Sequence, residues 1–244
     1  MNLQGADSKP GQSENKMKEA VILAGGLGTR LRDVTGQTPK AMAPVNGKPF
    51  LSYVLQMLSQ DGFDRIILAT GFLSAPIENY YGYSFGMMEI DYSVEKEPLG
   101  TGGAILLASK IILSDNFFVL NGDTYFNVDF EGMEDQFSAE KPDVLVALKQ
   151  MKDFDRYGSV SITNSRIVSF NEKKYCSEGL INGGIYLVNK KWLGGVSPGI
   201  KFSFEKDILE KHTESAVLNG FISDGYFIDI GIPEDYNRAI RELK

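Results

Sequence analysis

The chain has 244 residues, 43% of them hydrophobic and 23% charged, and 25 Lys and Arg against 32 Asp and Glu give a net charge of −7. This balance is typical of a globular chain and argues against a general nucleic-acid or anionic-membrane surface. One cysteine excludes an intramolecular disulfide, one histidine argues against a zinc site, and no apolar run reaches the about 20 residues of a membrane span. We therefore expect a cytoplasmic monomer or homodimer, without nucleic-acid or membrane partners, in which any metal has oxygen ligands.

The first 17 residues are polar and contain little that a core could bury. We interpret residues 1–17 as a disordered leader or an added remnant that takes no part in the fold. Folding is expected to begin near Lys18, and the length of the remaining chain predicts a single domain over residues 18–244.

A glycine-rich loop follows the first predicted strand. Val21 to Ala24 form an apolar run that predicts a buried strand, and Gly25-Gly26-Leu27-Gly28-Thr29-Arg30 follow directly. Glycines permit a tight turn that presents backbone N–H groups to an anion, and Arg30 and Lys40 can neutralise such an anion. The alternative is a plain strand-to-helix turn with two solvated bases.

The next elements alternate between helix and strand. Apolar residues at helical spacing, with a proline at the start, predict a helix over residues 49–58 that ends near Gly62. Residues 65–71 and 88–94 have the patterns of strands, and residues 76–81 form a short helix between them. Strands that alternate with helices predict an open α/β sheet.

A second glycine-rich loop, Glu95 to Ala104, leads into a helix that we expect to reach Lys110. Ligands of open α/β sheets bind beyond the carboxyl ends of the strands, so both glycine loops are expected to face one crevice and to hold a nucleotide. The alternative is that Thr101 only caps the helix. Beside this loop, Glu95 or Glu97 could accept hydrogen bonds from the N–H donors of a nucleotide base, and backbone carbonyls could do the same.

Two carboxylates stand at strand ends. Asp123 follows the apolar run Phe117 to Leu120 and a glycine, and Asp229 interrupts the apolar strand that precedes a terminal helix. A buried carboxylate is costly unless it is paired or bound to a metal, and Mg²⁺ prefers carboxylate and phosphate oxygens. For Asp123, a surface turn is the alternative interpretation.

The order of these motifs resembles that of the sugar-1-phosphate nucleotidyltransferases, and the resemblance covers essentially everything after the leader. The segments that carry it are Leu23 to Arg30, Pro39-Lys40, Glu97 to Gly103, Asn121 to Asp123, Asn171 to Lys173, Asn182 to Gly184 and Asp229 to Pro233. It implies a Rossmann-like, three-layer α/β/α fold with a mixed, mostly parallel central sheet. Within the family, segments 95–104, 147–158, 180–186 and 226–236 look most like the members that use GTP and a heptose 1-phosphate.

The resemblance implies that a sugar 1-phosphate oxygen attacks the α-phosphate of GTP and releases pyrophosphate. Arg30 and Lys40 would then bind the triphosphate and the phosphate that undergoes substitution, and Asp123 and Asp229 would hold Mg²⁺. The catalytic residues that the resemblance implies are thus Arg30, Lys40 and Asp123. The nucleotide-binding residues implied are Leu23, Ala24, Gly25, Gly26, Gly28, Thr29, Glu97, Pro98, Gly100, Thr101 and Gly122.

The acceptor side of the implied site comprises Glu172 and Lys173, the turn at Asn182 and Gly183, and Tyr157. In the family the carboxylate contacts sugar hydroxyls and the ammonium contacts the sugar phosphate. A solvated charge cluster is the alternative for the Glu-Lys pair, and packing against the sheet is the alternative for Tyr157. The chain departs from the family at Ala41 and Lys174, where proline is frequent. The departure at Lys174 leaves the conformation of the loop at Glu172 and Lys173 open, and the departure at Ala41 is expected to matter little because Lys40 is retained.

Three functions fit the sequence. The first is guanylyl transfer to a heptose 1-phosphate for surface polysaccharide synthesis, the second is the same chemistry on mannose 1-phosphate or with another nucleotide, and the third is nucleotide-sugar binding without catalysis. Arg30, Lys40 and both carboxylates argue against the third. We expect His212 to be a surface residue and Cys176 to be an unreactive loop residue, and we expect Ser203 to cap a helix that begins at residue 204.

Overall fold

The computed structural model describes residues 17–26, 39–71, 74–195 and 199–244. Of the predicted leader, only Met17 belongs to these ranges, so the expectation for residues 1–16 lies outside them. Within the described residues, no helix combines the length and the apolar composition that crossing a membrane requires.

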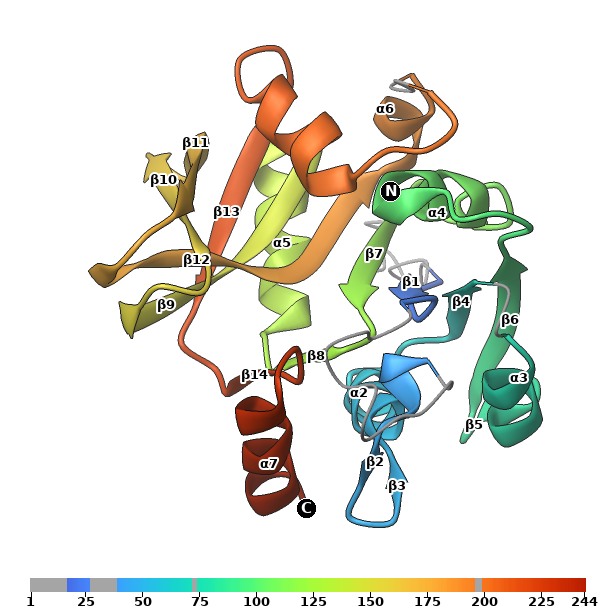
Figure 1. Ribbon diagram of the computed structural model, residues 1–244. Helices are drawn as coiled ribbons and strands as arrows, with labels where there is room; N and C mark the ends of the chain where they lie inside the picture. The colour runs from blue at the N-terminus through green and yellow to red at the C-terminus, as the bar shows by residue number, and fades with distance from the viewer. Residues whose placement is uncertain (1–16, 27–38, 72–73, 196–198) are drawn as a thin grey trace, which may run out of the picture.

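A ten-stranded sheet forms the middle of the molecule, in the order β10-β11-β13-β9-β12-β7-β1-β4-β6-β5 (Figure 1). Its strands are β1 (Glu19–Leu23), β4 (Arg65–Thr70), β5 (Ser84–Phe85), β6 (Met88–Val94), β7 (Asn116–Asn121), β9 (Val144–Phe154), β10 (Gly158–Thr163), β11 (Arg166–Lys173), β12 (Cys176–Asn189) and β13 (Leu218–Ser223). Two smaller sheets pair β2 (Pro44–Val45) with β3 (Lys48–Pro49) and β8 (Thr124–Phe126) with β14 (Phe227–Asp229).

The two halves of the large sheet differ in direction. In the first half, β7, β1, β4 and β6 pair in parallel, so their carboxyl ends lie at one edge. In the second half, β12 runs antiparallel to β7 and to β9, and β10 and β11 extend the antiparallel pattern; only β9 and β13 are parallel there. The sheet is therefore mixed, as predicted, but the expected parallel character belongs to its first half.

The helices cover both faces of this sheet. They are η2 (Lys40–Met42), α2 (Phe50–Gln60), α3 (Ala75–Tyr81), α4 (Gly100–Ala108), α5 (Phe130–Glu140), α6 (Lys190–Gly194), η3 (Phe204–Leu209), η4 (Glu210–His212) and α7 (Pro233–Glu242). Alternate residues of a strand face opposite sides. Accordingly, Ile22 of β1 packs in the cluster that contains residues of α2, α3, α5 and α7, and its neighbour Val21 packs with residues of α4, α6 and η3. Two buried clusters on one sheet give the predicted three layers.

The local predictions for the first half are confirmed with small shifts of their bounds. The helix expected over 49–58 is α2, the strands expected over 65–71 and 88–94 are β4 and β6, and the helix expected over 76–81 is α3. Ser203 does cap the helix that follows it, because its hydroxyl accepts a hydrogen bond from the Lys206 N–H, although η3 is a π-helix. Cys176 was expected in a loop, but it begins β12 because it pairs with Phe154.

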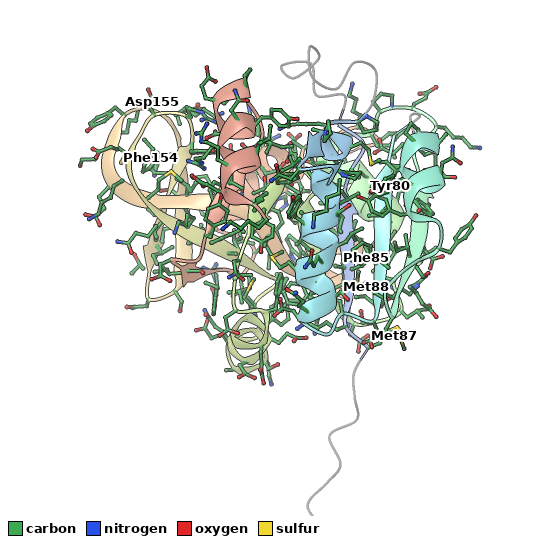
Figure 2. All side chains as sticks on the ribbon, turned by 90° about the horizontal axis from the view of Figure 1, so that it is seen from below. Tyr80, Phe85, Met87, Met88, Phe154 and Asp155 are labelled. Carbon is green, nitrogen blue, oxygen red and sulfur yellow. The ribbon has the colours of Figure 1, made fainter. Side chains whose placement is uncertain are left out.

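Two opposite ends of the molecule are seen in Figure 2, in which Tyr80, Phe85, Met87 and Met88 lie at one and Phe154 and Asp155 at the other. The first group belongs to α3 and to the hairpin of β5 and β6; Phe154 is the last residue of β9, and Asp155 follows it. The candidate site lies between these ends, where the parallel and antiparallel halves meet at β7 and β12.

Candidate active site

The first glycine loop is held by backbone contacts to its neighbours. The Ala24 N–H donates to the Ala69 carbonyl at 2.9 Å, and the Lys40 N–H donates to the Gly26 carbonyl at 3.2 Å. A Cβ atom at Gly25 would lie 2.6 Å from the Gly71 nitrogen, so the close approach of two backbones requires glycine there. The predicted roles of Gly28, Thr29 and Arg30 lie outside the described residues.

A cavity of about 370 Å³, here called the glycine-loop cavity, opens at the carboxyl ends of the parallel strands. Six of the predicted nucleotide-binding residues line it: Leu23, Gly25, Gly26, Pro98, Gly100 and Thr101. Asp123 lines it as well. The structure therefore brings the two glycine loops and one predicted metal ligand to a single cavity.

Three predicted nucleotide-binding residues do not line this cavity. Ala24 is buried beneath the loop, and Gly122 lies against the Leu23 carbonyl, which its N–H contacts at 3.0 Å. Glu97 is exposed. Glu95 lines the cavity instead, because its carboxylate turns back to accept a hydrogen bond from the Leu99 N–H at 2.7 Å. Partial burial raises the pKa of the Glu95 carboxyl above its ordinary value, against the effect of that N–H.

The glycines of the second loop serve close packing against another segment. A Cβ atom at Gly100 would lie 2.4 Å from the Phe202 carbonyl oxygen, and one at Gly102 would lie 2.2 Å from the Phe202 ring. The alternative interpretation, that Thr101 only caps α4, is wrong because α4 has no side-chain cap hydrogen bond. The Thr101 hydroxyl accepts from the Phe204 N–H and donates to Glu205, both at 2.8 Å. The loop is thus built to contact the segment 200–205.

Lys40, Asp123 and Asp229 form the centre of the site. The Lys40 ammonium lies 2.6 Å from Asp123 Oδ2 and 3.5 Å from Asp229 Oδ1, and its side chain is 13% exposed. Pairing of β14 with β8 aligns Asp229 with Thr124 and so brings it beside Asp123. Burial, and then repulsion by Asp123, raises the pKa of the Asp229 carboxyl, which Lys40 only partly offsets. Two carboxylates that share one cation are a suitable site for a further cation.

A second cavity of about 340 Å³, here called the Asn182 cavity, adjoins the first. Asn121 and Glu205 line both cavities, and the two central carboxylates are divided between them, with Asp229 in this one. Four of the predicted acceptor-side residues line it: Tyr157, Lys173, Asn182 and Gly183. The site is thus a pair of cavities that meet at the carboxylate pair.

Glu172, the remaining acceptor-side residue, is not brought to this cavity. It lies on β11 between Asn171 and Lys173, which both line the cavity, and successive side chains of a strand face opposite sides. Its side chain is accordingly exposed. Sequence reasoning placed the Glu-Lys pair in a polar loop, where both side chains could face one ligand. Pairing of β11 with β10 makes the segment a strand and separates them.

Tyr157 packs against another aromatic ring and also lines the Asn182 cavity, while its contact with the sugar stays a prediction. Its ring packs edge-on against Phe227 with the centroids 5.9 Å apart, and it also lines the Asn182 cavity. Burial, with the nearby charge of Asp229, raises the pKa of the Tyr157 hydroxyl to about 12, so the group stays protonated at neutral pH. It can therefore donate a hydrogen bond to an anionic or hydroxylated ligand.

The Asn182 side chain is fixed at both ends. Its amide nitrogen donates to the Tyr186 hydroxyl at 2.9 Å, and its oxygen accepts from the Gly184 N–H at 2.9 Å. Gly184 has a φ of +74°, and a Cβ atom there would lie 2.5 Å from the Asn121 amide nitrogen. Glycine is required at this position on both grounds.

Asn121, Asn171 and Glu205 are among the cavity-lining residues that the sequence did not identify as site residues. Asn171 and Asn121 were part of recognised motifs, but the alternation along β11 that assigns Asn171 to the cavity was not predicted. Glu205 carries no local signal, because it reaches the site only through the packing of η3 against α4. His212 lines neither cavity, as expected; its Nδ1 lies 2.8 Å from the Ile208 carbonyl.

The family model described as "Nucleotidyl transferase" matches residues 19–244, and the chain belongs to this family of nucleotidyltransferases. The α/β fold and the enzyme class expected from the sequence are thereby confirmed. The chain is 50% identical over 226 residues to the D-glycero-α-D-manno-heptose 1-phosphate guanylyltransferase of Aneurinibacillus thermoaerophilus, covering 93% of this chain and 98% of that protein. It is 44% identical over 219 residues to the protein of the same name from Campylobacter jejuni, covering 89% of this chain and 96% of that one.

The fold of the chain is also similar to that of a solved structure. HddC from Yersinia pseudotuberculosis, in a crystal structure complexed with GMP-PN, superposes with a TM-score of 0.83 at 40% sequence identity. The match covers 93% of this chain and all of that one. The resemblance to the subgroup that uses a heptose 1-phosphate, which the sequence motifs indicated, is therefore confirmed.

Proposed function

We propose that this chain transfers the guanylyl group of GTP to D-glycero-α-D-manno-heptose 1-phosphate and releases pyrophosphate, a reaction that supplies surface polysaccharide synthesis. The observation that carries the proposal is the pair of adjoining cavities, one lined by Asp123 and the other by Asp229, with the Lys40 ammonium in contact with both carboxylates. The similarity to two heptose 1-phosphate guanylyltransferases supports the choice of both substrates. The proposal includes one domain over residues 18–244, which acts as a monomer or homodimer. The single cysteine suits a reducing, cytoplasmic location.

The reaction needs positioning and charge neutralisation rather than a protein nucleophile. A phosphate oxygen of the acceptor bonds to the α-phosphorus of GTP, and the bond from that phosphorus to the β-phosphate oxygen breaks. The acceptor is already anionic at neutral pH, so no residue has to deprotonate it. Two polyanions must be held close together, and preorganised charges supply the required stabilisation. Lys40 contacts Asp123, which lines one cavity, and Asp229, which lines the other, and this supports its proposed contact with the phosphate that undergoes substitution. Arg30 remains a prediction for the triphosphate.

Asp123 and Asp229 are proposed to hold Mg²⁺. Two carboxylates face the single ammonium of Lys40, so the pair carries more negative charge than Lys40 neutralises. Burial, and then repulsion by Asp123, raises the pKa of the Asp229 carboxyl. Among the described residues there is no group of three His, Cys, Asp or Glu side chains arranged for a metal, and two carboxylates completed by substrate phosphates suit Mg²⁺. When bound, the ion would neutralise phosphate oxygens and act as a Lewis acid. The two carboxylates would orient it from both cavities.

The glycine-loop cavity is proposed to bind GTP, and Glu95 to accept hydrogen bonds from the guanine base. Glu95 lines the cavity and Glu97 does not, which favours the first of the two acids that the sequence offered. Glu95→Gln would replace one acceptor oxygen by a donor, so the preference for GTP over ATP should fall by about tenfold or more. Glu97→Gln is the matched control and should leave it unchanged. Equal discrimination in both variants would assign base selection to the backbone.

The Asn182 cavity is proposed to bind the sugar phosphate. Lys173 would contact the phosphate, and Tyr157, Asn182 and the backbone at Gly183 would contact the sugar. Glu172 is given no contact with the sugar phosphate because it does not line this cavity.

A panel of four nucleoside triphosphates against several sugar 1-phosphates tests the function. Purified protein with Mg²⁺ should release pyrophosphate only when GTP and the heptose 1-phosphate are both present. Faster turnover with mannose 1-phosphate would assign the chain to that acceptor instead. If pyrophosphate appears with none of the pairs, the enzyme proposal is wrong, and binding of GDP-sugars without turnover would indicate a sensor.

A further inference from the structure

Glu205 occupies a special place between the two cavities. Among the charged residues that the structure describes, it alone lines both the glycine-loop cavity and the Asn182 cavity. It lies on η3, a single π-helical turn, and such turns are frequent at functional sites. No role in the chemistry derived above requires it, because it contacts neither Lys40 nor the two central carboxylates among the hydrogen bonds of the described residues.

The contacts of Glu205 run in two directions. Toward the glycine-loop cavity, Oε2 accepts from the Thr101 hydroxyl at 2.8 Å and from the Ser203 hydroxyl at 2.9 Å. Toward the Asn182 cavity, Oε1 faces the Tyr186 hydroxyl, which donates to it at 3.4 Å. One carboxylate thus connects the start of α4 with β12.

The hydrogen bonds that begin at Glu205 continue through Tyr186 to Asn182 and Gly184, and in each of them the donor is the group farther from Glu205. Tyr186 is 1% exposed, and burial raises the pKa of its hydroxyl well above the ordinary value, so the group keeps its proton. Because it donates to Glu205, its lone pair is free to accept from the Asn182 amide, and the Asn182 oxygen is then left for the Gly184 N–H. The Asn182 amide is therefore oriented at its oxygen by the Gly184 N–H and at its nitrogen by the Tyr186 hydroxyl, and the acceptor at Glu205 sets the direction of that hydroxyl.

The second glycine loop is close-packed on the segment that carries Glu205. Cβ atoms at Gly100 and Gly102 would clash with Phe202, and Gly102 also donates its N–H to the Phe202 carbonyl at 3.0 Å. Close-packed groups transmit displacements because they have no void to absorb them. A ligand that shifts or rigidifies this loop therefore acts on Glu205 as well.

We propose that Glu205 is a positioning residue that couples the two cavities, so that a nucleotide at the glycine loops favours the Asn182 orientation that binds the sugar phosphate. The inference rests on the two-substrate function proposed above. In this role Glu205 contacts neither a substrate nor the metal and acts through Thr101, Tyr186 and Asn182. Coupling of this kind is reciprocal, so the sugar phosphate also favours binding of the nucleotide.

Titration calorimetry tests the coupling without turnover. The heptose 1-phosphate is titrated into the protein with Mg²⁺, with and without a GTP analogue whose α–β bridge is methylene and which cannot release pyrophosphate. In the unsubstituted chain the analogue should tighten binding of the sugar phosphate by about fivefold or more. Glu205→Gln keeps the shape but places N–H donors where acceptors stood, so the ratio should fall toward one, with each affinity measured alone changed less than about twofold.

Tyr186→Phe removes one hydroxyl and should lower the ratio equally, and the double variant should show no further loss because both act in one chain of hydrogen bonds. Glu214→Gln, at an exposed position that lines neither cavity, removes the same charge and should leave the ratio unchanged. An unchanged ratio in both Glu205→Gln and Tyr186→Phe overturns the inference, as does a loss of both single affinities together with a lower Tm. If neither ligand binds to the unsubstituted chain, the proposed function fails as well.

Discussion

The two cavities are built in different ways. The glycine-loop cavity lies at the carboxyl ends of parallel strands and is lined by backbone and small side chains, such as those of Gly25, Gly26 and Thr101. The Asn182 cavity lies among antiparallel strands and is lined by large polar and aromatic side chains, including Tyr157, Asn171 and Lys173. In the described residues, Lys173 is the cation that lines either cavity.

This difference has a physical basis in the chemistry of the ligands proposed for each side. A triphosphate chain can be held by backbone N–H groups, which glycine loops present without interference from side chains. A sugar is recognised by its hydroxyl pattern, which requires donors and acceptors at several positions and hence varied side chains. Asp123 lines the glycine-loop cavity and Asp229 lines the Asn182 cavity, and the metal ion that we propose for them would serve both ligands.

The largest expected effect is at the junction. Asp123→Asn removes one of two proposed metal ligands, and the loss of several kcal/mol of transition-state stabilisation should lower kcat by about 100-fold or more. Pyrophosphate release at saturating Mg²⁺ measures it. Asp135→Asn, at an exposed position of α5, is the control and should retain activity. Full activity in Asp123→Asn, with unchanged circular dichroism, would remove Asp123 from the site.

The next effect belongs to the acceptor side alone. Lys173→Met should raise the KM for the sugar phosphate by about 10-fold or more, because a charged hydrogen bond to phosphate is worth about 1.5–3 kcal/mol. The KM for GTP should change little. Lys174→Met is the matched control, since Lys174 is exposed and lines neither cavity. Equal effects of both substitutions on both substrates would show that the two cavities do not separate the ligands.

Glu172→Gln extends the same test and should have little effect on either KM. Should it instead raise the KM for the sugar phosphate as much as Lys173→Met does, then β11 has to rearrange when the acceptor binds. The family resemblance and the structure make opposite predictions for this residue.

The same difference between the cavities explains what the sequence could predict. Each glycine loop directly follows a strand, because ligands of parallel sheets bind in the first turn after a strand, where the crossover connection begins. Gly25 and Thr101 could therefore be predicted from local patterns. The acceptor side depends on pairing between distant segments. Gly158 pairs with Lys173, and the Asn171 amide contacts the carbonyl and hydroxyl of Ser159. Such pairing also decides which of Glu172 and Lys173 faces the cavity.

The position of Glu205 could not be predicted for a related reason. Nothing in the residues around it signals a ligand site, and its contact with Thr101 joins residues that are 104 positions apart. By contrast, Asp229 was found because a carboxylate inside an apolar strand conflicts with the local pattern. Sequence reasoning therefore finds residues that break a local rule and misses residues that follow one.

A smaller effect should follow from the backbone construction of the glycine-loop cavity. Gly25→Ala places a methyl group against the Gly71 backbone, which cannot yield as a flexible side chain would, so we expect a cost of about 1–3 kcal/mol and a Tm lower by several degrees. The KM for GTP should rise because the loop is displaced, while the KM for the sugar phosphate should not. Gly194→Ala, where a Cβ meets nothing within 4 Å, is the control. Thermal melting and initial rates give both readouts.

The smallest expected effect concerns Glu95, the charge placed among the small residues of the glycine-loop cavity. Because partial burial raises the pKa of its carboxyl in the folded state, the folded chain holds the proton more tightly than the unfolded chain does. The cost of ionising Glu95 is therefore absent below its ordinary pKa of 4.5, grows as the pH rises through the folded pKa, and is complete above it. Glu95→Gln should raise the Tm at pH 7 by roughly 1–2 °C and leave it unchanged at pH 4 or below.

Binding of GTP should depend on the same carboxyl in the opposite sense. The KM for GTP of the unsubstituted chain should rise as the pH falls through the folded pKa of Glu95, because the protonated carboxyl loses an acceptor for guanine. Glu95→Gln should lack this dependence. A KM that rises equally in both proteins would assign the pH effect to another group and leave base recognition to the backbone.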